Sequence, residues 1–169
     1  MGSTAGNPQP GTRSGRRRGG VPPLERLRSV IICDTNCLLS LVNDADPHHE
    51  EVRKIATSES RPLVVSPLVL AEFDYLVRKI VSGAVARSLL ERLLQGRMIE
   101  VAAMSHTDLL TAVKVDAKYA SLELGLADAS LVVLAYRYKT FDLLTRDERD
   151  FRPIVPLQGG AFRLLPKDR

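Results

Sequence analysis

The sequence predicts an α/β fold with a mainly parallel central sheet of four or five strands and helices on both faces of that sheet. Short runs of consecutive apolar residues, such as residues 30–33, alternate with longer segments whose apolar residues recur at helical spacing. Unbroken apolar runs are typical of strands that are covered on both faces. Strands separated by helices need crossover connections, and these favour a parallel sheet. A chain of 169 residues suits one such domain.

The N-terminal segment differs in composition from the rest of the chain. Residues 1–23 are dominated by Gly, Pro, Ser and Arg and have little apolar surface to bury. We therefore predict a disordered tail at residues 1–28 and one domain at residues 29–169. Six arginines and one glutamate lie within residues 1–29, so the net charge of +4 belongs to the tail and the domain is nearly neutral. The tail could contact nucleic acid electrostatically or could simply be solvated.

The first half of the domain contains two predicted strands and four predicted helices. The strands are short apolar runs, and the helices show apolar residues three or four positions apart. Ser66 is a favourable N-cap for the third helix, with Pro67 in its first turn, and Gly83 separates this helix from the fourth. In order, the elements are a strand at 30–33, helices at 36–42 and 47–57, a strand at 62–65, and helices at 66–81 and 85–94.

The second half adds two or three strands and two helices. A short strand is predicted near 98–102. The next helix has apolar residues in phase over 107–123, and Gly125 is expected to stop it. A further helix at 127–138, a strand at 141–145 and a possible last strand at 161–166 complete the domain.

Several classes of protein are disfavoured by the sequence. No apolar run approaches the ~20 residues of a membrane helix, and the N-terminus lacks the apolar core of a signal peptide. Cys33 and Cys37 are expected to be buried thiols in a reducing cytoplasm. A zinc site that combines them with His48 and His49 is rejected, because zinc ligands usually come in spaced pairs. We therefore predict a cytoplasmic protein.

Acidic side chains from four separate elements are expected near one edge of the sheet. In open α/β sheets, ligands collect beyond the carboxyl ends of the strands. Asp34 follows the first strand, and Thr145 and Asp147 follow the FDLL strand. Asp128 opens a predicted helix, and Glu72 lies in the helix after the second strand.

Each of these carboxylates also has a structural explanation. Asp34 fits a turn, Asp128 fits the first turn of a helix, and Asp147 fits a loop beside arginines. Glu72 is harder to explain, because we expect its helix to be largely covered and an unpaired buried charge is costly. Four clustered carboxylates would repel one another unless a divalent cation lies between them. Hard oxygen ligands suit Mg²⁺ or Mn²⁺, which can activate water and neutralise charge on a phosphodiester.

Four sequence features occur in the order and spacing of a known family. They are VIICDTNCLL, Glu72 six residues after Ser66, LADASLVVLA and LLTRDERDF. On these features the chain resembles the PIN-domain ribonucleases, and among them the VapC-type toxins of bacterial toxin–antitoxin pairs, over residues 29–155. The resemblance implies a PIN-like three-layer sandwich.

The resemblance also implies an activity and partners. Asp34, Glu72, Asp128 and Asp147 would be the catalytic, metal-binding quartet around Mg²⁺ or Mn²⁺, with Asp34 and Asp128 as the most direct ligands. Water activated by the ion would cleave RNA to leave 5′-phosphate and 3′-hydroxyl ends. Members of this family usually form homodimers, and a cognate antitoxin protein blocks the acidic pocket.

Further residues are assigned supporting roles by the same resemblance. Asn36 would buttress Asp34, Thr145 would orient water or phosphate through its hydroxyl, and Asp150 would support the quartet. With no Trp and 5% aromatic residues, the composition disfavours base-stacking platforms and favours phosphate contacts. Candidate phosphate ligands, which could equally be solvated loop charges, are Arg146, Arg149 and Arg152.

Two other functions compete with this interpretation. A phosphatase similar to haloacid dehalogenases also begins with a strand and an Asp, but it needs a second Asp where this chain has Asn36. A catalytically silent PIN-like module that binds RNA or protein is the other alternative, and the complete acidic quartet argues against it. For the ribonuclease, we expect that Asp34→Asn removes activity and relieves repulsion in the metal-free protein.

Overall fold

The structure, a computed structural model, describes residues 1–2, 29–58 and 60–169. The tail predicted at residues 1–28 lies almost wholly outside the described residues. In chain order the elements are β1 (Ile31–Cys33), α1 (Thr35–Val42), α2 (His49–Ser58), β2 (Leu63–Val65), α3 (Pro67–Ile80), α4 (Gly83–Gln95), β3 (Ile99–Val101), α5 (His106–Lys118), the 3₁₀ helix η2 (Ala120–Leu122), α6 (Gly125–Tyr138), β4 (Asp142–Leu144), α7 (Glu148–Phe151) and β5 (Arg163–Leu165).

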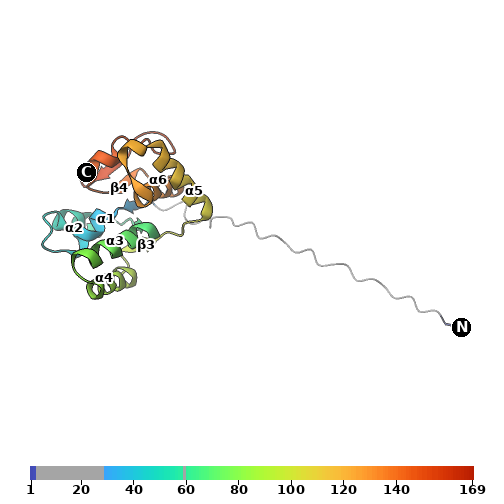
Figure 1. The fold of residues 1–169 in the computed structure, drawn as a ribbon, viewed down its shortest axis with the longest axis horizontal. Coiled ribbons are helices and arrows are strands. Elements are labelled where there is room, and N and C mark those ends of the chain that lie inside the picture. Colours follow the sequence, from blue (N-terminus) through green and yellow to red (C-terminus); the bar gives the residue numbers. More distant parts are fainter. Residues whose placement is uncertain (3–28, 59) are drawn as a thin grey trace.

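The five strands form one parallel sheet in the order β3-β2-β1-β4-β5. The chain moves outward from β1 to β3 and then crosses back to β4 and β5. Right-handed crossovers therefore put α1 to α4 on one face and α5 to α7 on the other. Figure 1 shows α1 to α4 grouped on one side and α5 and α6 on the other, and α3 and α6 contact each other. The predicted α/β fold is confirmed, and the change of direction between β1 and β4 creates the crevice in which such sheets bind ligands.

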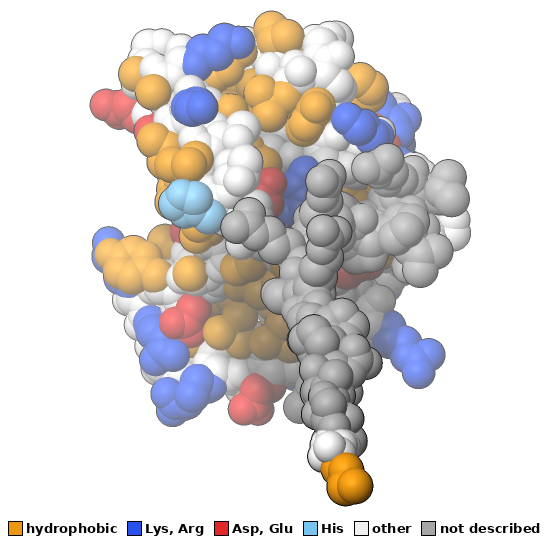
Figure 2. Space-filling model, turned by 90° about the vertical axis from the view of Figure 1, so that its right-hand side faces the viewer, with side chains coloured by type: hydrophobic (Ala, Val, Ile, Leu, Met, Phe, Trp, Pro, Cys, Tyr) orange, Lys and Arg blue, Asp and Glu red, His pale blue; other side chains and the backbone are white. Residues whose placement is uncertain are grey.

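The three central strands form the middle of the hydrophobic core. All residues of β1, β2 and β4 are buried, as the apolar sequences of β1 and β2 and the two leucines of β4 predict, whereas the edge strand β3 is mostly exposed. On the face shown in Figure 2, basic, acidic and apolar side chains are interspersed over the described part of the molecule. Within the described residues, no helix has both the length and the apolar character that crossing a membrane requires.

The predicted helix boundaries are wrong at two glycines. Gly83 was expected to separate two helices, but α4 begins at Gly83 itself because Ser82 caps it by accepting a hydrogen bond from the Val85 backbone N–H at 3.3 Å. The helix predicted at 107–123 ends earlier, at Lys118. Gly125 begins α6, with φ of +74°. Glycine adopts this left-handed conformation without steric cost, so the residue turns the chain into α6.

A buried carboxylate holds the amino end of β4. Asp142 is 7% exposed and forms ion pairs with Arg61 and with Arg163, whose Nη2 lies 2.5 Å from Oδ2. Burial by itself would raise the pKa of Asp142, but hydrogen bonds from Arg163 and Arg61 outweigh it and lower the pKa. A lowered carboxyl pKa contributes stability that is present above about pH 4 and is lost as the pH falls through the folded-state pKa.

Asp142→Asn is expected to destabilise the fold at neutral pH by about 2 kcal/mol, because it leaves two arginines facing a neutral amide. The cost is less than for a fully buried pair, since the side chain of Arg163 is half exposed and its charge is screened. Urea unfolding at neutral pH measures the difference. The gap between the two proteins should narrow as the pH falls below about 4 and passes through the lowered folded-state pKa of Asp142. An unchanged midpoint at neutral pH would contradict the assigned role.

Candidate active site

The first strand delivers Asp34 to the carboxyl edge of the sheet. Its backbone N–H donates to the carbonyl of Leu144 at 3.0 Å, which extends the pairing of β1 with β4 by one residue. Helix α1 begins at the next residue, and the Asp34 carboxylate caps it by accepting from the backbone N–H of Thr35 at 2.5 Å. Asp34 is therefore both a turn residue and a candidate site residue, because the cap fixes the direction of its buried carboxylate.

Two further donors hold the same carboxylate. Oδ2 of Asp34 accepts from Asn36 Nδ2 at 2.6 Å and from Thr145 Oγ1 at 2.6 Å. The Thr145 oxygen in turn accepts from the backbone N–H of Asp147 at 3.0 Å, and the residue is 1% exposed. Its hydroxyl therefore positions Asp34 and the following loop. A role of this hydroxyl in orienting water or phosphate stays a prediction.

Glu72 reaches the site from α3, but not for the reason that the sequence suggested. The buried face of α3 consists of Val69, Phe73 and Val77, and Glu72 lies on the exposed side. The expectation of a covered carboxylate in need of an ion is therefore wrong. What fixes Glu72 is the Thr35 hydroxyl, which donates to its Oε2 at 2.5 Å. Thr35 was not predicted as a site residue.

Asp128 lies in the first turn of α6 without acting as its cap. The helix begins at Gly125, and the preceding residue, Leu124, makes no capping hydrogen bond through its side chain. Asp128 is partly buried. Within the described residues, its carboxylate has no hydrogen-bond donor and no ion-pair partner. A helix-capping role therefore does not explain this residue.

Asp147 and Asp150 come from the segment after β4. Asp147 is the N-cap of α7, and its Oδ1 accepts from the backbone N–H of Asp150 at 3.2 Å. Asp150 is 8% exposed and forms an ion pair with Arg149 Nε at 3.0 Å. Phe151 is 1% exposed and belongs to the core.

The structure brings all four predicted carboxylates together around one pocket of about 190 Å³. They come from the end of β1, from α3, from the start of α6 and from the loop after β4, so both helical layers contribute. Asp150 does not line this pocket. Its lining residues are Asp34, Thr35, Asn36, Leu39, Glu72, Leu76, Asp128 and Asp147.

The pocket is strongly unfavourable for negative charge. Burial raises the pKa of Asp34 to about 6, although the hydrogen bonds from Thr145 and Thr35 oppose the shift. Burial also raises the pKa of Asp128 to about 8, and the charges of Asp34 and Glu72 add to this effect. Burial is therefore the main reason why the charged form of both carboxyls is disfavoured, and the neighbouring acidic groups add to it.

The donor set of this pocket fits a hard divalent cation. Within the described residues, no three His, Cys, Asp or Glu side chains are grouped closely enough to enclose an ion by themselves. Mg²⁺, however, is usually bound by one or two carboxylates and keeps several waters. Asp128 has free oxygens, and Oδ1 of Asp34 accepts only one of the three hydrogen bonds made to that carboxylate. These two residues would hold the ion, with Glu72 and Asp147 beside it.

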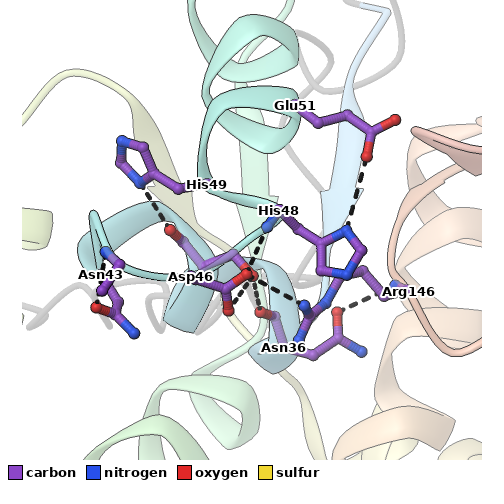
Figure 3. Close-up of polar contacts among 9 residues, drawn as sticks. Asn36, Asn43, Asp46, His48, His49, Glu51 and Arg146 are labelled. Carbon is purple, nitrogen blue, oxygen red and sulfur yellow. Dashed lines mark hydrogen bonds and ion pairs between the residues drawn. The ribbon is translucent and has the colours of Figure 1, made fainter.

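The three candidate phosphate ligands lie in different surroundings. Arg152 is held by Asp168, at 2.5 Å, and by Glu148. Arg149 pairs with Asp150, while its side chain remains 85% exposed. Arg146 follows Thr145 directly, and Figure 3 shows its contacts with Asn36 and Asp46. The sequence did not single out Asp46, because its partner Arg146 is 100 residues away in the chain.

Comparisons with known proteins agree with this geometry. Residues 31–154 match the family model of the PIN domain. Ribonuclease VapC26 of Mycobacterium tuberculosis is 40% identical over 136 residues, which is 80% of this chain and 100% of that protein.

Solved structures show the same fold at low sequence identity. VapC20 of Mycobacterium tuberculosis, a toxin that cleaves the sarcin-ricin loop, has a TM-score of 0.63 and 16% identity, and the match covers 70% of this chain and 90% of that one. VapBC2 of Rickettsia felis bound to a promoter DNA fragment has a TM-score of 0.60 and 19% identity, and the match covers 80% of this chain and 98% of that one. FitAcB of Neisseria gonorrhoeae has a TM-score of 0.56 and 20% identity, and the match covers 79% of this chain and 97% of that one.

Proposed function

Since the chain belongs to the PIN-domain family, and within it to the VapC ribonucleases, we propose that it is the toxic endoribonuclease of a type II toxin–antitoxin pair and that its cleavage of RNA depends on Mg²⁺ or Mn²⁺. The observation that carries the proposal is the pocket of four carboxylates, in which Asp128 has a pKa raised to about 8. Membership of this family excludes the phosphatase alternative. The fold that positions the carboxylates is shared with VapC20.

In this proposal the side chains of the pocket have separate roles. Asp34 and Asp128 would hold the cation, and Glu72 and Asp147 would orient water at the pocket. When bound there, a divalent cation supplies the positive charge that acidifies water and stabilises charge on a phosphodiester. Asn36 and Thr145 fix the direction of Asp34, and Thr35 does the same for Glu72. Hydrolysis with the 3′-oxygen as the leaving group would give 5′-phosphate and 3′-hydroxyl ends.

An apolar groove beside the pocket supports the proposal of an antitoxin partner. The groove measures about 470 Å³, and Leu39 lines both the groove and the acidic pocket. Ile80 and Val81, which also line it, are 73% and 62% exposed. Large exposed apolar surfaces of this kind mark protein-binding sites. One of the structural relatives is a toxin–antitoxin complex from Klebsiella pneumoniae. We propose that a cognate antitoxin binds here, that the toxin is a homodimer, and that it acts on cytoplasmic RNA.

Purified full-length protein is expected to cleave RNA with Mg²⁺ or Mn²⁺ and to lose the activity when the metal is removed with EDTA. The reason is that the four carboxylates by themselves repel a phosphodiester. Sequencing of the RNA ends, with a ligation step that requires a 5′-phosphate, checks both the site and the chemistry. Restoration of activity by added Mg²⁺ controls for damage by the chelator.

Two outcomes would contradict this proposal in different ways. Cleavage at full rate in EDTA would exclude a metal mechanism. Tight binding of RNA or antitoxin without any cleavage would instead favour the silent PIN-like module. Coexpression with the product of a small upstream reading frame tests the antitoxin, which should copurify with the chain and suppress its activity.

A further inference from the structure

Arg146 is linked both to the acidic pocket and to the apolar groove beside it. Its neighbours in the chain, Thr145 and Asp147, contact or line the acidic pocket. Its backbone N–H donates to Asn36 Oδ1 at 3.1 Å, which ties it to the residue that holds Asp34. Its side chain is 32% exposed and lines the apolar groove next to the pocket. The side chain therefore lies in the groove that shares Leu39 with the acidic pocket, and we call this shared edge the rim of the pocket.

One carboxylate holds this guanidinium in place. Asp46, in the loop between α1 and α2, accepts from Arg146 Nη1 at 3.3 Å, and its own side chain is 15% exposed. Ser40 Oγ, at 3.1 Å, and the backbone N–H of His48, at 2.8 Å, fix the carboxylate from the other side. Figure 3 shows Asp46 between the backbone of His48 and the side chain of Arg146. The anchor is therefore itself rigidly held.

The contact uses only part of the arginine. Within the described residues, Nε and Nη2 of Arg146 make no hydrogen bond, so most of its donors remain available. Arg152 differs, because both of its terminal nitrogens bind Asp168. Arg149 differs as well, because its side chain is 85% exposed and its ion-pair partner is the adjacent Asp150. Among the three arginines of this segment, Arg146 combines a fixed position with available donors.

We propose that Asp46 is a positioning residue for the nuclease reaction: it holds Arg146 at the rim of the acidic pocket, where the guanidinium binds an RNA phosphate next to the scissile one. The inference rests on the proposed ribonuclease function. Its physical basis is that RNA entering a pocket of carboxylates is repelled, and a fixed cation at the rim offsets that repulsion. The planar guanidinium also suits a phosphate geometrically.

Asp46 also has a structural role in the turn before α2, in addition to its contact with Arg146. Its backbone N–H donates to the carbonyl of Asn43 at 2.9 Å, and its own carbonyl accepts from the backbone N–H of His49 at 2.9 Å. Asp46 is thus also a turn residue that leads into α2. Asp46→Ser retains a short side chain that can cap the turn but is too short to reach Arg146. Asp46→Asn retains the shape and loses the charge.

The test measures RNA binding in an Asp128→Asn background, in which the RNA stays intact. The probe is a fluorescently labelled single-stranded RNA of mixed sequence, titrated at several salt concentrations. Arg146→Ala is expected to weaken binding about tenfold and to reduce the slope of log affinity against log salt by about 0.7, as for the loss of one phosphate contact. Asp46→Ser should weaken binding similarly, and Asp46→Asn should weaken it less.

The decisive comparison is the double variant. If Asp46 acts through Arg146, then Asp46→Ser should have no further effect when Arg146→Ala is present. Glu50→Gln is the matched control, because it breaks a 3.0 Å pair with Arg53 on α2, away from the pocket, and should leave binding unchanged. The proposal would be overturned if Asp46→Ser weakened RNA binding equally with and without Arg146, or if Asp46→Ser did not weaken binding at all. It would also be overturned if the Asp128→Asn protein did not bind the RNA. Because the readout is binding, a wild-type protein that binds through Arg146 but does not cut would refute only the ribonuclease function.

Discussion

Asp128→Asn is expected to remove RNA cleavage and, at the same time, to stabilise the metal-free protein. Activity should fall by more than about a hundredfold. This is more than the loss that is typical when the mutated residue contacts a metal ligand but not the metal itself. Stability should rise because Asp128 has a pKa raised to about 8 by burial and by its acidic neighbours, and the structure gives its carboxylate no donor within the described residues. Asparagine is neutral at every pH, so it removes the free-energy cost of protonating this carboxyl or burying its charge in the folded protein above about pH 4. The melting temperature at neutral pH should therefore rise by on the order of a few degrees.

Two matched variants show whether the effect belongs to the pocket. Asp44→Asn makes the same change of charge at a side chain that is 96% exposed, and it should alter neither activity nor melting temperature. Asp34→Asn should lose activity and also stability, because an amide cannot accept all three hydrogen bonds that Asp34 receives from Thr35, Asn36 and Thr145. This replaces the expectation that Asp34→Asn relieves repulsion. A melting temperature that falls equally in Asp128→Asn would contradict the assignment of Asp128.

The metal-free protein is expected to lose stability as the pH rises from about 4 to about 8, by on the order of a few kcal/mol in total. Burial raises the pKa of Asp34 to about 6 and that of Asp128 to about 8. Folded protein therefore binds more protons than unfolded protein in this range. The linkage relation then gives a stability that is fully present below the unfolded-state pKa and declines as the pH passes through the folded-state values.

Urea unfolding at a series of pH values, in EDTA and in Mg²⁺, measures this dependence. A cation bound to the ionised carboxylates should restore stability at about pH 8 and have little effect at about pH 5, where Asp128 is protonated. Asp128→Asn should flatten the decline in EDTA, and Asp44→Asn should leave it unchanged. Metal-free stability that stays constant or rises between these two pH values would contradict the electrostatics of the pocket.

The fold was predictable because its signals are local. The apolar runs of β1, β2 and β4 mark strands covered on both faces, and all three are buried. The helix ends were less predictable, since a glycine can either stop a helix or start one. At Gly83 the outcome depends on the capping hydrogen bond that the Val85 backbone N–H donates to Ser82, and at Gly125 on a left-handed φ. Such choices are made by one or two hydrogen bonds that apolar periodicity does not report.

The candidate site was predictable only in part. Asp34 and Asp147 follow strands, and parallel strands bring their carboxyl ends to one edge, so their meeting follows from the order of elements. Glu72 was placed correctly at the pocket but by a wrong argument, because it is exposed and its position depends on Thr35. The sequence also did not show that the Thr145 hydroxyl holds Asp34.

By itself, the sequence determined the parallel α/β fold and the set of acidic residues at its carboxyl edge, because strand and helix patterns and residue order are properties of the chain. Only the tertiary structure decided which of these residues are held by donors and which lack them. It left Asp128 without a donor in the described residues and joined Asp46 to Arg146 across 100 positions. The physical reason is that hydrogen bonds and pKa values depend on distances of a few ångströms between distant segments, and these distances exist only once the sheet and both helical layers are assembled.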